Sequence, residues 1–579
     1  MQQEYERWLT YEHLDEGVRN DLLAIREDEA EIEECFYEKL SFGTGGIRGK
    51  LGPGPNRMNV YTVRKAAKGL ANYVKTHTVN YENRGVVIAY DPRHMSEAFA
   101  FEVAKVLGVD NIKTYIFDTI QPTPLLSFAV RYLRTVAGIM ITASHNPPEY
   151  NGLKVYNEAG SQITSAEADN IIASINAIED ELQIETKSKA YLEEHGLLQM
   201  LQDEVSDAYL KQILPMSSIT GGERPAEKDL GIVFTPLHGT ATRLVSEGLR
   251  KLEFTNLHIV EEQTTADPEF STVASPNPED PRAFTKAIEL GKSMNADILL
   301  ATDPDADRLG VAVKNKAGAY ETLTGNELGA LLLDFILAHT DERLLPNARM
   351  IKTIVTSEFG RAIASSYGVK TIDTLTGFKY IGEKINEFDR TGERFIFGYE
   401  ESYGYLMSTC VRDKDGVHAA IMACELAQYW RDRGLSLVDA LDRLYEKHGY
   451  YKEGIGDLTL EGISGIETIA HIVERFRTES FSSFGKLKSL YKEDYLYSER
   501  RNLQDETEVL TLDLPKENVV KYILADGCWV CVRPSGTEPK IKWYYGAYGE
   551  SEEEVNERLE MLESTLHDII VKEKRTKVY

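Results

Sequence analysis

The feature that most constrains the fold is the alternation of short apolar runs with longer helix-like segments through most of the 579 residues. This alternation is typical of parallel strands joined by crossover helices. In one example, residues 85–91 form a predicted strand, and Ser96 is the predicted N-cap of a helix that continues to Leu107. The sequence therefore predicts an α/β protein.

Polar loops follow several of the predicted strands. In open α/β sheets, ligands bind at the carboxyl ends of the strands, so these loops are the candidate site segments. They end apolar runs at residues 138–146, 231–239, 297–308, 394–402 and 528–539.

Length and charge exclude several classes of protein. At roughly 150 residues per domain, the length predicts about four domains. Lys and Arg number 65 against 93 Asp and Glu, a net charge of −28, which disfavours binding to nucleic acids and anionic membranes. The apolar run 328–338 is too short to cross a bilayer and is predicted as a buried helix. The five scattered cysteines favour a reducing compartment, and we expect a cytoplasmic protein.

The segment Asp303-Pro-Asp305-Ala-Asp307-Arg308 follows a predicted strand. Three carboxylates at alternate positions of a turning loop can converge on one hard cation, so the segment predicts a divalent metal site. A calcium-binding EF-hand loop is excluded, because Arg308 and Lys314 stand where that loop requires Gly and Glu. A solvated acidic turn is the alternative.

The segment Thr142-Ala-Ser144-His145-Asn146-Pro147 follows another apolar run. Ser144 at a strand end is a candidate nucleophile, which the neighbouring His and Asn side chains could activate or assist. The GxSxG signature of many serine hydrolases is absent here, and Ser and Asn also simply form turns. Lys154 lies close behind and could reach the same pocket as a proton donor or a charge clamp.

Other segments offer groups that bind anions or sugar hydroxyls. The run from Arg533 to Lys540 (RPSGTEPK) could form a short nest for a phosphate, although a plain hairpin turn is equally compatible. The glycine-rich segment 42–49 lets its backbone and Arg48 approach a ligand closely, but it lacks dinucleotide-binding spacing. Segments 376–379 and 398–402 add a lysine and hydrogen-bond acceptors.

Taken together, these motifs resemble the α-D-phosphohexomutase superfamily, and within it the bacterial phosphoglucomutases of the phosphoglucomutase/phosphomannomutase family. They occur in the order found in that family and extend from residue 42 to residue 540. Gly45 and Tyr399 stand where relatives often have other small residues, which bears on substrate preference. The motifs are FGTGGIRG (42–49), TASHNPPEYNGLK (142–154), DPDADR (303–308), TGFK (376–379), GYEES (398–402) and RPSGTEPK (533–540).

The resemblance implies a fold of three related α/β domains with mixed sheets, followed by a TBP-like α+β domain, around a central cleft. Each domain contributes one loop: the phosphoserine loop, the metal-binding loop, the sugar-recognition loop and the phosphate-binding loop. The corresponding domains are expected at residues 1–205, 206–322, 323–455 and 456–579.

The resemblance also implies roles for individual residues. Ser144 is the expected phosphoserine, and Asp303, Asp305 and Asp307 are the expected ligands of one Mg²⁺ per active site, with Ser144 as a further ligand. Lys154 is the expected proton carrier ahead of His145, since burial beside other cations can lower the pKa of a lysine. The expected catalytic and substrate-binding set is Thr44, Arg48, Ser144, His145, Lys154, Asp307, Arg308, Thr376, Lys379, Glu400, Ser402, Arg533, Ser535, Gly536 and Thr537.

The implied activity is interconversion of α-D-glucose 1-phosphate and glucose 6-phosphate, with glucose 1,6-bisphosphate as intermediate and activator. Phosphopentomutase or phosphomannomutase activity is the alternative within the superfamily. A metal-dependent sugar phosphatase and a non-catalytic sugar-phosphate binder are alternatives of another class. The expected partners are small sugar phosphates, and the protein is expected to be a monomer or a homodimer.

Overall fold

The computed structural model describes residues 1–43, 45–217, 228–460, 462–505, 508–535 and 540–576. The chain divides into two compact units. Unit 1 comprises Met1–Leu328 and Phe378–Leu437, and unit 2 comprises Gly329–Gly377 and Val438–Tyr579. No helix in the described part of the chain has the length and hydropathy that crossing a bilayer requires.

The first part of unit 1 is a six-stranded mixed sheet in the order β1-β5-β4-β2-β3-β6. Strands β4, β2, β3 and β6 are parallel, whereas β5 runs antiparallel to both β4 and β1. The strands are β1 (Gly46–Lys50), β2 (Val86–Tyr90), β3 (Thr114–Phe117), β4 (Ala137–Ile141), β5 (Tyr150–Asn157) and β6 (Leu198–Leu201). The helices are α1 (Gln2–Leu9), α2 (Glu16–Ala24), α3 (Glu29–Phe36), α4 (Val60–His77), α5 (Tyr81–Arg84), α6 (Ser96–Leu107), α7 (Thr123–Leu133), α8 (Ser165–Asn176), α9 (Lys189–Glu194) and α10 (Asp203–Ser217).

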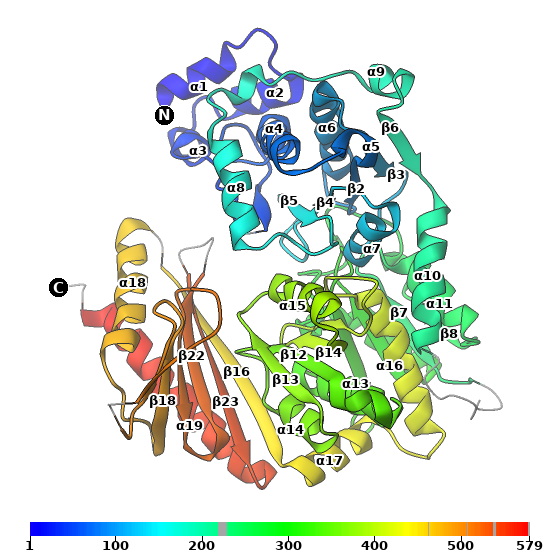
Figure 1. Cartoon of the computed structure of the whole chain (residues 1–579), viewed down its shortest axis with the longest axis vertical. Coiled ribbons are helices and arrows are strands. Elements are labelled where there is room, and N and C mark those ends of the chain that lie inside the picture. The colour runs from blue at the N-terminus through cyan, green and yellow to red at the C-terminus, as the bar shows by residue number, and fades with distance from the viewer. Residues whose placement is uncertain (44, 218–227, 461, 506–507, 536–539, 577–579) are drawn as a thin grey trace. The chain divides into compact units, whose positions relative to one another are not determined.

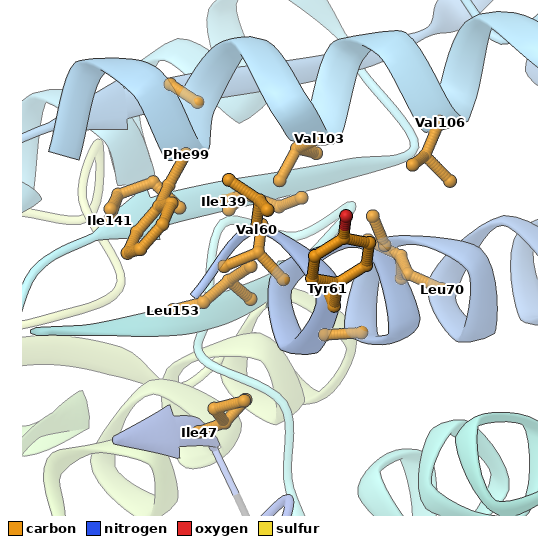
Figure 2. Packing of buried hydrophobic residues seen from close by; sticks show 14 of the residues in the cluster. Ile47, Val60, Tyr61, Leu70, Phe99, Val103, Val106, Ile139, Ile141 and Leu153 are labelled. Atoms are coloured by element: carbon orange, nitrogen blue, oxygen red, sulfur yellow. The ribbon is translucent and has the colours of Figure 1, made fainter. Parts of the chain in front are cut away.

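Helices α4 and α6 form the core of this part with the sheet. Figure 2 shows Val60 and Leu70 of α4, Phe99 and Val103 of α6 and Ile139 of β4 packed together, and all five are buried. Burial of each such side chain stabilises the fold by about 1.5–3 kcal/mol. This packing fixes the direction of β2 and β4, and therefore the place where the loops after them emerge.

A five-stranded sheet follows in unit 1, in the order β11-β10-β9-β7-β8. Strands β9, β7 and β8 are parallel, and β10 runs antiparallel to β9 and β11. This repeats the arrangement of β4, β2 and β3 with β5 and β1, as expected for related domains. The elements are β7 (Ile232–Thr235), α11 (Thr242–Lys251), β8 (Leu257–Ile259), α12 (Thr285–Met294), β9 (Ile298–Thr302), β10 (Leu309–Lys314) and β11 (Tyr320–Thr322).

The next elements of the chain belong partly to each unit. In unit 2, β12 (Ala348–Thr353) and β13 (Lys370–Thr374) pair in parallel; in unit 1, β14 (Arg394–Glu400) and β15 (Gly404–Leu406) pair antiparallel. The predicted buried helix at 328–338 is confirmed as part of α13. The helices are α13 (Gly325–Ala338), α14 (Phe359–Ser366), α15 (Phe378–Thr391), α16 (Gly416–Arg431) and α17 (Leu437–His448).

The C-terminal part of unit 2 is an antiparallel sheet in the order β16-β23-β22-β21-β18-β19-β20, with β17 paired to β18. Helices α18 (Gly462–Thr478) and α19 (Glu552–Thr576) share one apolar core with this sheet, so the part is α+β as expected (Figure 1). The strands are β16 (Tyr450–Thr459), β17 (Ser483–Phe484), β18 (Leu487–Asp494), β19 (Glu499–Asn502), β20 (Val509–Thr511), β21 (Val520–Leu524), β22 (Trp529–Pro534) and β23 (Lys540–Gly549).

The prediction that Ser96 is the N-cap of its helix is wrong. Helix α6 begins at Ser96 itself, and Met95 precedes it with φ +65°. The Ser96 hydroxyl donates instead to Asp91 Oδ1 at 2.8 Å. A carboxylate is a strong acceptor for a hydroxyl group. The Ser96 side chain is therefore directed to Asp91 and not to the N-terminus of the helix.

Candidate active site

Ser144 lies on the loop that follows β4, as predicted from the sequence. The residue is buried and has φ +52°, a left-handed conformation that a serine seldom adopts. Its backbone N–H donates to the Thr142 hydroxyl at 2.8 Å. The surrounding contacts therefore hold the loop in a conformation that its own residues do not favour.

Asp303, Asp305 and Asp307 lie on the loop that follows β9. Ala306 has φ +52°, and its N–H donates to the Asp303 carbonyl at 2.9 Å, which closes a tight turn. All three carboxylates are buried, and one oxygen of each lies within 4.8 Å of the others. The Ser144 hydroxyl donates to Asp303 Oδ2 at 2.7 Å, so the candidate nucleophile lies at the edge of this carboxylate cluster.

The carboxylate cluster has the chemistry of a cation site. Asp305 Oδ1 and Asp307 Oδ1 are buried without a hydrogen-bond partner among the described residues. Burial, with repulsion from Asp305 and Asp307, raises the pKa of Asp303 well above its usual range. Buried anionic oxygens without donors are costly unless a cation satisfies them. The residues therefore fit a hard divalent metal with oxygen ligands.

Two lysines, with side chains 13% and 14% exposed, face the same carboxylates. Lys154, on β5, places Nζ 2.8 Å from Asp305 Oδ2 and 3.2 Å from Asp307 Oδ2. Lys414, just before α16, places Nζ 3.2 Å from Asp307 Oδ2. Burial alone would raise the pKa of Asp307, but attraction to Lys154, Lys414 and Arg308 holds that pKa well below its usual range.

The expected lowering of the Lys154 pKa is not found. Burial does lower it, but Asp305 and Asp307 outweigh burial and raise the pKa above its ordinary value. The prediction considered only neighbouring cations. The carboxylates that raise the pKa belong to a loop about 150 residues away in the sequence. The structure therefore describes Lys154 as a firmly charged ammonium group.

Further predicted residues lie around Ser144 in unit 1. His145 Nδ1 is 3.3 Å from Ser144 Oγ, and burial with repulsion from Arg308 and Arg48 lowers the pKa of His145 well below its usual value. Arg48, on β1, donates to Asn146 Oδ1 at 2.7 Å. Arg308 donates its backbone N–H to Asp303 Oδ1 at 3.0 Å and forms an ion pair with Glu279.

Glu400 ends β14 and is buried. Burial raises its pKa to about 7, and the positive charges of Lys414 and Arg308 oppose that rise. Ser402 follows on the same loop and is half-buried. Lys379, on α15, lies over the ring of Tyr380 at 4.9 Å. These residues offer acceptors and a cation within unit 1.

The remaining predicted residues are in unit 2 or outside the described residues. Arg533, on β22, has buried Nε and Nη1 atoms without a hydrogen-bond partner in the described part of the chain, and the same holds for Thr376 Oγ1. The Ser535 N–H donates to the Lys540 carbonyl at 2.6 Å. The predictions for Thr44, Gly536 and Thr537 fall on residues that the structure does not describe.

Sequence reasoning missed Lys414, Asp91 and Arg93. Lys414 lies in the run Arg-Asp-Lys-Asp-Gly, whose dense charge beside the buried helix α16 was the available signal. Asp91 and Arg93 follow β2 at the same sheet edge as Ser144. The sequence indicated polar residues at the end of this strand, but it did not indicate that they contact the Ser144 loop.

Four family descriptions match most of the chain. They are Phosphoglucomutase/phosphomannomutase alpha/beta/alpha domain I at residues 39–182, domain II at 207–318 and domain III at 324–448, and the C-terminal domain at 491–564. Two curated relatives are each called phosphoglucomutase. The one from Staphylococcus aureus (strain MRSA252) is 41% identical over 90% of this chain and 92% of its own length. The one from Staphylococcus epidermidis is 40% identical over 92% of this chain and 94% of its own.

Solved structures share the fold at lower sequence identity. Parafusin from Paramecium, described as a phosphoglucomutase, aligns with a TM-score of 0.67 at 16% identity and covers 93% of this chain and 96% of its own. A phosphomannomutase homologue from Thermus thermophilus aligns with a TM-score of 0.66 at 20% identity, covering 92% and 99% respectively.

Proposed function

Because the chain belongs to the phosphoglucomutase/phosphomannomutase family, we propose that it is an isomerase that interconverts α-D-glucose 1-phosphate and glucose 6-phosphate. The staphylococcal relatives, which span nearly its whole length, support glucose as the sugar. The observation that carries the chemistry is the 2.7 Å hydrogen bond from Ser144 Oγ to Asp303 Oδ2. It supports Ser144 as the proposed nucleophile, because Oγ lies beside carboxylates that fit a divalent metal.

We propose that Asp303, Asp305 and Asp307 hold one Mg²⁺, with an oxygen of phospho-Ser144 as a further ligand. Their clustered, partly unpartnered oxygens support this assignment. When bound, the metal neutralises charge on the phosphoryl oxygens. Lys154 and Lys414 balance the remaining charge of Asp305 and Asp307, which keeps three buried carboxylates compatible with a dianionic substrate.

The proposed reaction is two phosphoryl transfers in opposite directions. Phospho-Ser144 gives its phosphoryl group to the free hydroxyl of the sugar monophosphate: the bond from phosphorus to Oγ breaks, a bond to the sugar oxygen forms, and the hydroxyl proton passes to Oγ. The resulting glucose 1,6-bisphosphate turns around. Its other phosphoryl group is then transferred to Ser144: the bond from phosphorus to that sugar oxygen breaks, a bond to Oγ forms, and the Oγ proton passes to the sugar oxygen. Positioning and charge neutralisation supply most of the catalysis in such transfers.

Lys154 is the proposed proton carrier, and His145 is the alternative. The charged Lys154 can deliver a proton to Ser144 Oγ as the phosphoryl group leaves. His145 Nδ1 lies 3.3 Å from Oγ, and its lowered pKa leaves it neutral. Because Lys154 also balances the charge of Asp305 and Asp307, His145→Gln is the deciding variant: wild-type kcat excludes His145 as the carrier, and a large loss of kcat favours it.

The other predicted residues are proposed as substrate contacts. We assign the non-reacting phosphate to Arg533, Ser535, Gly536 and Thr537, and the buried guanidinium nitrogens of Arg533 support this. Glu400 and Ser402 are assigned to the sugar hydroxyls. Thr44, Arg48, Arg308, Thr376 and Lys379 are assigned to the rest of the site.

The five cysteines are unpaired, which supports a location in a reducing cytoplasm.

The function is tested by intact-mass analysis combined with turnover. We expect the purified protein to carry one phosphate on Ser144, to lose it to excess glucose 1-phosphate and to form glucose 6-phosphate. A kcat/KM at least ~10-fold higher on ribose 1-phosphate than on glucose 1-phosphate would assign a pentose substrate instead. Inorganic phosphate released as fast as glucose 6-phosphate would indicate a phosphatase, and an unchanged mass during turnover would contradict the phosphoserine route.

The pH dependence of catalysis should report Glu400. Its pKa of about 7 means that the carboxylate, the form that accepts two sugar hydroxyls, predominates only above that pH. We expect kcat/KM to rise by about tenfold between pH 6 and pH 8, following this ionisation. Glu400→Gln should lower kcat/KM at pH 8 by roughly 10–100-fold and flatten this rise.

Glu401→Gln is the matched control for this pH profile. The Glu401 charge contributes to the raised pKa of Glu400, so its removal should move the rise to lower pH while preserving the high-pH plateau. A profile of Glu400→Gln that still rises like that of the wild type would assign the titration to another group.

A further inference from the structure

Two buried residues that the proposed reaction does not use follow β2. Asp91 and Arg93 are 1% and 3% exposed, and their side chains form an ion pair with Arg93 Nε 3.3 Å from Asp91 Oδ2. A guanidinium is costly to bury unless its donors are satisfied, so the direction of its five N–H groups is informative.

The Arg93 guanidinium points into the loop that carries Ser144. Nη2 donates to the carbonyls of Ser144, at 2.5 Å, and Asn146. Nη1 donates to the carbonyls of Pro147 at 2.8 Å and Tyr150 at 3.0 Å. One planar cation therefore donates hydrogen bonds to four carbonyl groups within the seven residues 144–150.

Asp91 holds the other side of the same loop. The Thr142 hydroxyl donates to Asp91 Oδ2 at 2.6 Å and accepts the Ser144 N–H at 2.8 Å. The Ser96 hydroxyl donates to Asp91 Oδ1 at 2.8 Å, which explains why Ser96 does not cap its helix. The backbone N–H and the carbonyl of Ser144 are thus both tied to the pair of Asp91 and Arg93, and φ of Ser144 is +52° between them.

A phenylalanine from a distant loop covers Arg93. The Phe270 ring lies 5.0 Å from the Arg93 guanidinium carbon and is 1% exposed. Its loop is shaped by Asp267, which accepts the N–H groups of Glu269 at 3.0 Å and Ser271 at 2.9 Å. A desolvated cation over an aromatic face gains attraction and is shielded from water. Phe270 therefore limits the orientations open to the guanidinium.

We propose that Arg93 is a positioning residue that sets the conformation of the Ser144 loop for phosphoryl transfer, and that Phe270 acts through Arg93. The proposal rests on the proposed function, in which Ser144 is the nucleophile. Only a planar fork can reach four carbonyls at once; a lysine places all its donors on one nitrogen. Displacement of a nucleophile by about 1 Å costs roughly 10²-fold in rate, so catalysis should be sensitive to the fork.

The test compares Arg93→Lys and Arg93→Ala with a matched arginine. Arg84 also donates to two backbone carbonyls of this domain, those of Arg134 at 2.9 Å and Thr135 at 3.2 Å, away from the Ser144 loop. We expect Arg93→Ala to lower kcat by about 10²-fold or more with KM changed less than about threefold. Millimolar guanidinium ion should raise the kcat of Arg93→Ala to at least a tenth of the wild-type value. Arg84→Ala should keep its activity, and guanidinium should not change it.

Phe270 gives a second measurement. Phe270→Leu keeps most of the apolar cover and should keep most of the rate, whereas Phe270→Ala should lower kcat by about tenfold with KM little changed. Phe117→Ala, at another fully buried position of the same unit, is the control for loss of core packing alone.

Several outcomes would overturn the proposal. These are an Arg93→Lys enzyme with wild-type kcat, a variant whose KM rises while kcat is kept, or a folded Arg93→Ala enzyme that guanidinium does not rescue. If Arg93→Ala does not fold, a crystal structure of Arg93→Lys decides: an unchanged φ at Ser144 and an unchanged Ser144–Asp303 contact contradict positioning. Absence of mutase activity in the wild-type protein would contradict the proposed function. Comparison of the wild-type and Arg93→Lys structures would still test whether Arg93 positions the loop.

Discussion

Replacing Ser144 by alanine is expected to abolish sugar-phosphate isomerisation, with kcat lower by at least about 10⁴-fold. In the proposed mechanism the Oγ atom gives and accepts the phosphoryl group, and it is the hydroxyl that donates to Asp303 Oδ2 at 2.7 Å. The fold should survive, because the loop is held through backbone groups of Ser144 rather than through Oγ.

The measurement is turnover of purified glucose 1-phosphate, free of bisphosphate, together with intact mass. Ser144→Ala should carry no phosphate before or after incubation with glucose 1,6-bisphosphate. Ser174→Ala is the control: its hydroxyl donates only to the Asn170 carbonyl on the exposed side of α8. A Ser144→Ala protein with more than a tenth of the wild-type rate would refute the phosphoserine mechanism.

Replacing Asp305 by asparagine is expected to lower kcat by on the order of 10³-fold and to weaken Mg²⁺ binding strongly. The substitution keeps the shape of the side chain but removes one of three charges that converge within 4.8 Å. It also removes the charged partner that Lys154 has at 2.8 Å. Both effects act against the charge balance that phosphoryl transfer needs.

Thermal unfolding supplies a measurement that does not depend on activity. A ligand that binds only the folded protein raises Tm, so millimolar Mg²⁺ should raise the Tm of the wild type and not that of Asp305→Asn. Asp110→Asn, which removes a carboxylate paired to Lys68 and Lys75 away from this loop, should keep the Mg²⁺-dependent rise. An equal rise in wild type and Asp305→Asn would show that the metal binds elsewhere.

The carboxylate loop was predictable because its ligands are neighbours in sequence. Asp303, Asp305 and Asp307 need only one turn, closed at Ala306, to converge, and a turn after a buried strand is a local property. The position of Ser144 at a strand end was predictable for the same reason. The α/β class followed from alternating periodicity, which the packing of α4 and α6 on the first sheet confirms.

The partners of these loops were not predictable in the same way. Lys414 lies more than 100 residues from Asp307 in the sequence, and Phe270 lies more than 170 residues from Arg93. No local pattern indicates which distant side chain meets which, because that depends on the order and direction of strands in the sheets. The prediction that Ser96 caps its helix failed for a related reason. Asp91, which accepts the Ser96 hydroxyl, lies just upstream in the sequence, but its burial is a tertiary property.

The sequence by itself determined the fold class and the placement of the three carboxylates and of Ser144 on loops that follow strands, since each depends on short-range periodicity or spacing. Only the tertiary structure decided the charge state of Lys154, the left-handed conformation of Ser144 and the contacts of Asp91 and Arg93 with its loop. The physical reason is that electrostatic fields and backbone strain are sums over everything that folding brings within a few ångströms. Those neighbours come from several strands and helices of unit 1, and the chain order does not reveal them.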